Sequence, residues 1–347
     1  MKVALVAPQF EAIPPVGYGG TELVAANIIK GLMAQGHDVT VYASADSKTK
    51  AKVKPVAPMA IWKSKRQAYS DTFYQSLELD MVREDEQKYD IIHNHIDYNF
   101  FILTRFLKTP VITTFHGPVN RKEQIDLYRR FNKDNHFVSI SDDQRRDAKN
   151  LNWVRTVYNG IDMGLYGLAK KPKRDYLLWL GRADQSKGPD LAIKIAKKFG
   201  MKLKLVCRVS PWEEEFFNKA VKPYIDGKKV EFIGEITLSE KVKLYQNAYA
   251  TLMPNRWREP FGLVMTESMA CGTPVVGPHL GSIPEIIKEG EVGFMGKDAA
   301  EMAKKLKGAE KINPQDCYDR VQKLFSVDAM AEGYVKAYEK VLKKGKG

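Results

Sequence analysis

Residues 3–42 read VALVAPQFEAIPPVGYGGTELVAANIIKGLMAQGHDVTVY and contain one complete strand–helix–strand unit. Val3–Ala7 is a short, continuous apolar run, as expected for a buried strand. Thr21–Ala34 has apolar residues at helical spacing, and Val39–Tyr42 is a second apolar run. Because two parallel strands need a crossover between them, this order predicts a parallel sheet covered by a helix.

The same alternation continues along the chain and starts again after the polar stretch Lys170–Arg174. Two similar α/β halves are therefore expected. Later strands are predicted at Ile91–Ile92, Val111–Thr113, His136–Ile140, Tyr176–Leu180, Leu203–Cys207, Val230–Ile233 and Thr251–Pro254, and later helices at Pro189–Phe199, Pro314–Leu324 and Asp328–Leu342. Ligands of such sheets bind beyond the carboxyl ends of the strands, which predicts a site in a cleft between two facing sheets.

Composition predicts a soluble two-domain protein, with 347 residues of which 44% are hydrophobic and 28% are charged. No apolar run reaches the roughly 18 residues that span a bilayer, and the opening run is too short for a signal peptide, so a cytoplasmic protein is expected. The three cysteines are widely spaced and form no Cys-x-x-Cys pattern. Neither a disulfide nor a structural zinc is expected.

The net charge of +13 is concentrated in the second half. Residues 1–165 hold 22 Lys and Arg against 19 Asp and Glu, which leaves 33 against 23 for the remainder. The lysines are scattered, which favours solvated helix faces and an anionic small ligand over a nucleic-acid groove. Weak peripheral contact with a membrane stays open, as does the oligomeric state.

A glycine-rich loop, residues 14–22, joins the first predicted strand to the first helix. Gly19 and Gly20 would let a ligand approach closely, and the free N–H groups at the helix start favour a phosphate. The loop matches neither G-x-G-x-x-G nor G-x-x-x-x-G-K-[ST], which argues against dinucleotide and ATP sites. A simple turn before a helix explains the same residues equally well.

Histidines follow two predicted strands of the first half. His116, in Phe115-His116-Gly117, is placed to reach into a cleft, where neutral imidazole can donate to a sugar hydroxyl, although a lone histidine is more often structural. The spacing of His93 and His95 would suit a metal, but they lack nearby acidic or cysteine partners. No metal is expected there.

In the second half, Arg182 and Lys187 lie in one loop between a predicted strand and a helix. A guanidinium and an ammonium at these positions would grip a diphosphate at two points, and ordinary surface charges are the alternative. Beyond a later strand, Gly234 and Ile236 could offer backbone groups to a base.

The segment REPFGLVMTE, residues 258–267, combines two carboxylates with a proline, a glycine and a short apolar stretch. A helix starting near Phe261 would have Glu267 about two turns in and Glu259 in the preceding loop. The glutamates could then hold hydroxyl groups at the two ends of an extended ligand whose anionic middle faces the helix start. A nucleotide-diphosphate sugar has this shape. A surface helix with an acid near its start is the alternative.

With these motifs in this order, the chain resembles the family 4 glycosyltransferases, which are retaining enzymes with the GT-B fold. The resemblance spans nearly the whole chain, and the ordered set of motifs is more specific than any one member. The matching elements are the glycine-rich first loop, Phe115-His116-Gly117, Asn159-Gly160-Ile161-Asp162, Gly181-Arg182 with Lys187-Gly188, and Glu259–Glu267 followed by Ala270–Val275.

The resemblance implies an α/β protein of two facing Rossmann-like domains with a central cleft. Residues 1–165 would form the acceptor-side domain and residues 166–327 the nucleotide-sugar domain, with a last helix at about 328–347 packing back onto the first. Two departures stand out. Cys207–Pro211 replaces a glycine-containing turn that family members often have, and Tyr166 stands where phenylalanine is common.

The resemblance also implies roles for the candidate residues. The two residues assigned to catalysis are His116, near the transferred sugar, and Glu259, which contacts the sugar. Glu267 would bind the ribose. The remaining donor contacts would be Gly19, Gly20, Arg182, Lys187, Phe261, Gly262 and Leu263, with a base contact at Gly234 and Ile236.

The implied reaction is transfer of a hexose from a nucleotide-diphosphate sugar to an unidentified acceptor, with retention of anomeric configuration. UDP-glucose is mildly favoured, because the first loop looks like that of family members that use it. The sequence has no Asp-x-Asp motif, and neither a metal nor another cofactor is expected. A non-catalytic, two-lobed nucleotide-sugar binding protein is the alternative, and RNA binding ranks last.

Overall fold

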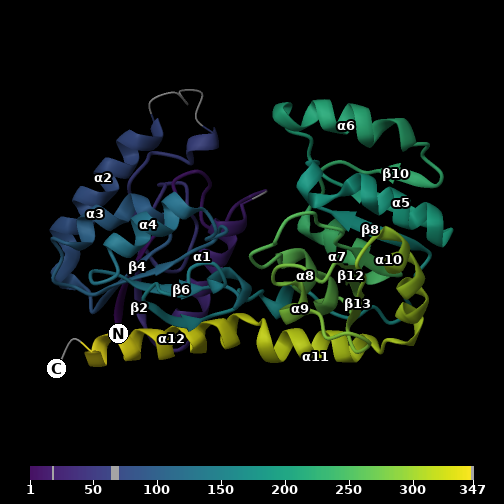
Figure 1. Ribbon diagram of the computed structural model, residues 1–347. Coiled ribbons are helices and arrows are strands. Elements are labelled where there is room, and N and C mark those ends of the chain that lie inside the picture. Colours follow the sequence, from purple (N-terminus) through teal and green to yellow (C-terminus); the bar gives the residue numbers. More distant parts are fainter. Residues whose placement is uncertain (18, 64–69, 345–347) are drawn as a thin grey trace. The chain divides into compact units, whose positions relative to one another are not determined.

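The apolar runs of the first half form parallel strands, as their pattern predicts. Figure 1 shows the computed structural model, which describes residues 1–17, 19–63 and 70–344. In this part of the chain, seven strands form one sheet in the order β3-β2-β1-β4-β5-β6-β7, and all neighbours are parallel. The strands are β1 (Lys2–Val6), β2 (Asp38–Ala43), β3 (Lys52–Pro55), β4 (Ile91–Asn94), β5 (Val111–Thr114), β6 (His136–Ser139) and β7 (Trp153–Thr156); the helices between them are α1 (Gly20–Ala34), α2 (Ser70–Asp85), α3 (Phe101–Thr104) and α4 (Lys122–Arg130).

A second parallel sheet follows, with the strand order β10-β9-β8-β11-β12-β13. Its strands are β8 (Tyr176–Leu180), β9 (Lys202–Val206), β10 (Val230–Phe232), β11 (Ala250–Leu252), β12 (Val275–Gly277) and β13 (Gly293–Met295); its helices are α5 (Pro189–Phe199), α6 (Glu214–Ala220), α7 (Leu238–Asn247), α8 (Leu263–Ala270), α9 (Ile283–Ile286), α10 (Ala299–Lys305) and α11 (Pro314–Leu324). Helices lie on both faces of this sheet (Figure 1).

Each sheet has a point where the strand order reverses direction. In the first sheet the chain adds strands on one side of β1 and then returns to β4 on the other side; in the second sheet the same happens at β8 and β11. Loops that leave two such neighbouring strands diverge to opposite faces of the sheet and leave a crevice at its carboxyl edge. The candidate site residues should therefore be sought on the loops after β1, β4, β8 and β11.

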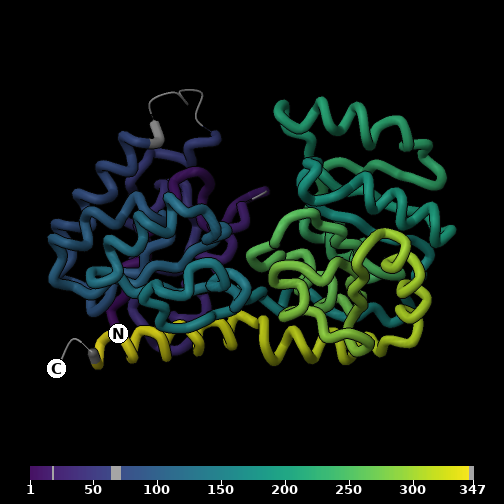
Figure 2. Tube along the Cα trace, in the orientation of Figure 1, coloured from purple at the N-terminus to yellow at the C-terminus, as the bar shows by residue number. Residues whose placement is uncertain are grey.

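The chain divides into two compact units, one of Met1–Gly160 with Val327–Gly347 and one of Ile161–Ser326. Helix α12 (Val327–Lys344) belongs to the first unit, together with strand β1, so the first and the last described elements lie in the same unit (Figure 2). It packs against α1, and Gly31 makes this crossing close: a Cβ there would lie 2.6 Å from the Ala331 Cβ.

The strand cores explain why the apolar runs are continuous rather than alternating. In β8, Leu177 and Trp179 belong to one buried cluster, while Tyr176 and Leu178 belong to a second cluster. A strand that is covered on both faces needs apolar residues at successive positions. Its five residues are the same five that the sequence predicts.

Several short elements lie outside the sequence prediction. Strands β12 and β13 have three residues each, and β3 is an edge strand of sequence KVKP that is exposed at both ends. Such segments have no apolar run long enough to stand out. Among the described residues, no helix combines the length and the apolar content needed to cross a membrane.

Candidate functional site

The loops after β8 and β11 form the centre of the candidate site in the second unit. These strands are neighbours, with Leu178 opposite Thr251, so their loops leave the sheet side by side. The Arg256 N–H donates to the Ser186 carbonyl at 2.7 Å, and the Arg256 guanidinium donates to both Asp190 carboxylate oxygens at 2.8 and 2.6 Å. These contacts fix the loop after β11 against the loop after β8 and against the first turn of α5.

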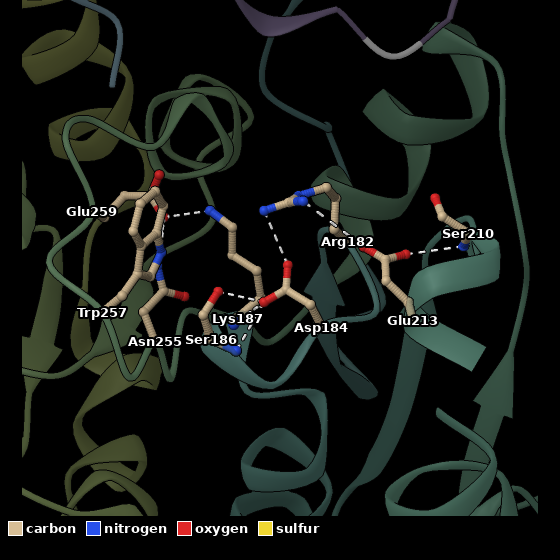
Figure 3. A network of polar contacts seen from close by, with 9 residues as sticks. All are labelled: Arg182, Asp184, Ser186, Lys187, Ser210, Glu213, Asn255, Trp257 and Glu259. Atoms are coloured by element: carbon tan, nitrogen blue, oxygen red, sulfur yellow. Dashed lines mark hydrogen bonds and ion pairs between the residues drawn. The ribbon is translucent and has the colours of Figure 1, made fainter. Parts of the chain in front are cut away.

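Lys187 and Glu259 meet across these two loops. The Lys187 Nζ donates to the Glu259 Oε2 at 2.5 Å, and its ammonium lies 4.7 Å from the centre of the Trp257 ring. The same oxygen accepts from the Asn255 Nδ2 at 2.6 Å and the Trp257 Nε1 at 3.0 Å (Figure 3). Both side chains are largely buried, with 17% and 9% exposed. Three donors therefore hold one carboxylate oxygen in place.

The other oxygen of Glu259, Oε1, makes no hydrogen bond to any residue that the structure describes. The main chain of Glu259 is also fixed, because its carbonyl accepts from the Ser282 N–H at 3.0 Å. Gly281 has a φ of +62°, and a Cβ there would lie 2.6 Å from the Glu259 nitrogen. The site thus offers one oriented carboxylate oxygen as an acceptor for a ligand hydroxyl.

Arg182 lies between two carboxylates rather than standing as a free cation. Its Nη2 is 3.1 Å from the Asp184 Oδ2, and its Nη1 is 4.0 Å from the Glu213 Oε1 (Figure 3). Its side chain is 41% exposed, whereas that of Glu213 is 1% exposed. The predicted pair of cations, Arg182 and Lys187, is therefore matched by three carboxylates, those of Asp184, Glu213 and Glu259.

Glu213 follows directly after Cys207–Pro211, the segment that departs from the family pattern. After β9, Ser210 begins a capping box in which the Glu213 Oε2 accepts from the Ser210 N–H at 3.0 Å. The Glu213 Oε1 is buried and has no hydrogen-bond partner among the residues that the structure describes. Burial and the Glu213 charge raise the pKa of the nearby Cys207 thiol to about 12. The turn after β9 thus places a buried negative charge near Arg182.

Glu267 belongs to a separate polar network. Its Oε1 accepts from the Lys241 Nζ at 2.6 Å and the Tyr166 hydroxyl at 3.0 Å, and its Oε2 accepts from the Tyr245 hydroxyl at 3.1 Å. Burial and the Glu267 charge raise the pKa of Tyr166, so this hydroxyl stays a donor. Tyr166, which stands where family members often have phenylalanine, therefore adds a hydrogen bond to Glu267, the predicted ribose-binding residue.

The helix after Glu259 starts later than predicted. Helix α8 begins at Leu263, with Gly262 as its N-cap at a φ of +84°, so Glu267 is its fifth residue and lies about one turn in rather than two. The sequence placed the start at Phe261, but Phe261 is buried and packs against Phe325 at 5.9 Å between ring centres. Packing of this side chain and the left-handed glycine delay the first helical turn.

Gly234 and Ile236 follow β10, the edge strand, which β9 separates from β8. Gly234 has a φ of +82°, and Ile236 packs against the buried cluster that contains Tyr176. No described contact links either residue to Lys187 or Glu259. They remain predicted base contacts.

In the first unit, Gly19 and Gly20 stand where the first loop enters α1. Gly19 is the N-cap, and a Cβ there would lie 2.8 Å from the Pro15 Cβ, whereas a Cβ on Gly20 would meet no atom of a described residue within 4 Å. Glu22 in the first turn is buried, and this burial raises its pKa. The start of α1 is thus packed on the side of Gly19 and open on the side of Gly20.

His116 follows β5 and contacts His95, which follows β4. The His95 Nδ1 and the His116 Nε2 are 2.8 Å apart, and burial lowers the pKa of His116 to about 4. His93 is bound on both ring nitrogens, to Thr114 at 2.8 Å and to Tyr338 of α12 at 2.7 Å. Among the described residues, no three His, Cys, Asp or Glu side chains are arranged to hold a metal.

Sequence reasoning singled out Lys187 and Glu259, whose side chains meet in the structure, but missed the residues that orient them. Asn255 and Trp257 lie on the same strand-end loop as Glu259, and Asp184 lies between Arg182 and Lys187. Their position after strands was the signal available. Glu213 could have been found from the S-x-x-E capping pattern that starts at Ser210.

Comparison with known proteins agrees with this architecture. Residues 167–322 match the family "Glycosyl transferases group 1", and residues 18–165 match "Glycosyltransferase Family 4". An uncharacterized glycosyltransferase of Methanocaldococcus jannaschii is 23% identical, over 83% of each chain. The crystal structure of AviGT4, a glycosyltransferase involved in avilamycin A biosynthesis, has 25% identity and a TM-score of 0.77, covering 99% of this chain and 98% of that one.

A second similar structure is that of Anabaena HepE in complex with UDP-glucose, at 17% identity and a TM-score of 0.73, covering 98% of this chain and 99% of that one. Together the two family matches cover both halves of the sequence. The chain belongs to the family 4 glycosyltransferases and has the GT-B fold, as the resemblance implied. It is therefore a glycosyl-transferring enzyme.

Proposed function

We propose that this enzyme transfers a hexose from a nucleotide-diphosphate sugar, with UDP-glucose as the favoured donor, and that the anomeric configuration is retained. The contact between Lys187 and Glu259 carries the proposal, because it joins a cation and an oriented carboxylate on the two loops of the strand-order reversal. The HepE complex with UDP-glucose supports this choice of donor.

In the proposed reaction, the acceptor hydroxyl oxygen bonds to the anomeric carbon while the bond from that carbon to the phosphate oxygen breaks. The leaving diphosphate takes up the acceptor proton. Lys187 and Arg182 stabilise the charge that grows on the diphosphate, as fixed charges in a site of low polarity do most effectively. We propose that these two cations do this without a metal.

Glu259 positions the sugar in this proposal. Its Oε2 is held by Lys187, Asn255 and Trp257, so its Oε1 can accept from one sugar hydroxyl in a defined direction. The helix start at Gly262 and Leu263 and the open side of Gly20 are the proposed phosphate contacts, and Glu267 is the proposed ribose contact. His116 is the proposed partner of the transferred sugar. The acceptor is unidentified.

The test is release of nucleoside diphosphate from UDP-glucose, and then from other nucleotide sugars, with a panel of hydroxyl acceptors. We expect turnover, with an α-linked product by proton NMR. Glu259→Gln keeps the size and shape of the side chain but removes its charge. A hydrogen bond to a charged group contributes about 1.5–3 kcal/mol, so kcat/KM of this variant should fall about 10- to 100-fold. The exposed Glu310→Gln is the matched control.

A non-catalytic binding protein would give a different result. It would bind a nucleotide sugar tightly and release no nucleoside diphosphate with any acceptor, and Glu259→Gln would change only the affinity. An inverted product anomer would contradict the retaining mechanism alone.

A further inference from the structure

His95 lies between two other histidines at the carboxyl edge of the first sheet. Its ring centre is 4.0 Å from that of His93 and 5.1 Å from that of His116, with which it is stacked. Only the contact with His116 is a hydrogen bond, because His93 uses both of its nitrogens elsewhere. His93 therefore contacts the His95 ring by packing alone.

The free nitrogen of His95 decides where the proton of the His95–His116 bond lies. The His95 Nε2 is buried and has no hydrogen-bond partner among the described residues. A buried N–H without an acceptor is rarer in proteins than a buried acceptor without a donor. The His95 proton therefore belongs on Nδ1, from which it is donated to the His116 Nε2.

The tautomer of His116 follows from this assignment. Its Nε2 accepts a hydrogen bond, so the single proton of the neutral ring is on Nδ1. The low pKa of about 4, caused by burial, keeps the ring neutral at physiological pH. The His116 side chain is partly exposed, and its Nδ1 makes no hydrogen bond to a described residue. An N–H donor is thus left for a ligand.

We propose that His95 is a positioning residue that holds His116 as the Nδ1–H tautomer, so that His116 presents a neutral hydrogen-bond donor to an oxygen acceptor on the ligand. The acceptor class is a hydroxyl or ring oxygen of a sugar. This last step rests on the proposed function, whereas the tautomer itself is a property of the ligand-free protein.

The ligand-free protein gives the first test, by ¹⁵N NMR of protein labelled on the histidine rings. Protonated and bare ring nitrogens have separate ¹⁵N shifts, and the two ring nitrogens are distinguished by their couplings to the ring protons. We expect the proton on Nδ1 in both His95 and His116. A His116 ring protonated on Nε2 would overturn the proposal, whatever the enzyme transfers.

Two variants of His95 separate positioning from simple packing. His95→Asn can place an amide N–H close to the position of Nδ1, and His95→Leu fills similar space without a donor. We expect the asparagine variant to keep the His116 tautomer, with kcat/KM within about threefold of the wild type. The leucine variant should lose the tautomer preference, with kcat/KM lower by about tenfold, the size expected for one hydrogen bond.

Equal tautomer populations in the wild type and the leucine variant would overturn the proposal. So would an unchanged transfer rate in a leucine variant whose tautomer preference is lost, because His116 would then donate to nothing that matters for the reaction. If no nucleotide sugar is turned over at all, the proposed function fails, while the NMR measurement still decides the role of His95.

Discussion

The neighbours of Arg182 change its expected role in ligand binding, because its guanidinium already lies near two carboxylates. Its distance of 3.1 Å to Asp184 and 4.0 Å to the buried Glu213 means that a diphosphate would compete with carboxylates for the guanidinium. In the proposed donor complex, the three carboxylates that surround the two cations would weaken the binding of an anionic product. If these loops bind the donor as proposed, we expect the buried Glu213 to lower the affinity for the leaving nucleotide.

A substitution at Glu213 tests this competition. Glu213→Gln keeps an acceptor for the Ser210 N–H and removes the charge, so UDP should bind a few-fold more tightly, as measured by calorimetry. Glu215→Gln is the control, since Glu215 is exposed on α6 and carries the same charge. Equal or weaker UDP binding by Glu213→Gln than by the control would show that Glu213 does not compete for Arg182.

At the residue scale, the sequence was informative where a charge follows an apolar strand. Lys187 and Glu259 could be chosen because the ends of parallel strands meet at one sheet edge. The S-x-x-E pattern indicates Glu213 as a helix-capping residue, but not as a partner of Arg182, because Glu213 comes near the guanidinium only through the turn that Ser210 begins. The hydrogen bond between Tyr166 and Glu267 joins residues 101 positions apart, and no local pattern encodes such a contact.

At the element scale, the crossing of α1 and α12 holds the C-terminal helix on the first unit. The Gly31 position is within 3.0 Å of two α12 atoms of Val327 and within 2.6 Å of the Ala331 Cβ, measured from the place of an added Cβ. This close approach lets Tyr334 and Tyr338 reach the sheet, where Tyr338 bonds to His93 and Tyr334 to Thr114. The last helix thereby supports the histidine cluster.

Gly31→Ala should therefore destabilise the first unit, although alanine favours a helix more than glycine does. Overpacking of this kind costs about 1–3 kcal/mol, against a gain of about 1 kcal/mol in helix propensity. Urea unfolding would measure the net loss, with Gly17→Ala as control because an added Cβ there meets no atom of the described part of the chain within 4 Å. If the Gly31→Ala protein were as stable as the control, α12 could move away from α1 with no loss in the free energy of unfolding.

Elements with a clear apolar pattern or a proline start were predictable from the sequence, whereas the three-residue strands and the long helix α2 were not predicted. The bounds of α5 and α11 agree with the predicted helices because each begins at a proline and has an apolar stripe over three turns. Strands β12 and β13 are set by pairing with β11 and with each other rather than by their own pattern. The start of α8 depends on where Phe261 packs, which is a tertiary effect.

At the scale of the whole molecule, the chain repeats one plan: a parallel sheet whose order reverses beside its first strand, with polar side chains on the loops that leave the reversal. This repeat was predictable because buried parallel strands leave continuous apolar runs. Membership in family 4 defines the reaction class of the chain, which is glycosyl transfer. The account depends most on the assignment of the β8 and β11 loops to a nucleotide-diphosphate sugar.

Isothermal titration of a nucleotide-sugar panel, beginning with UDP-glucose, into the wild type and Lys187→Gln tests this assignment most directly. The wild type should bind at least one member of the panel, and Lys187→Gln should bind it at least about tenfold more weakly, because a charged contact to the diphosphate is lost. Lys194→Gln, at an exposed position on α5, should bind like the wild type. Failure of the wild type to bind any nucleotide sugar, or equal affinity of the folded Lys187→Gln protein, would contradict the account.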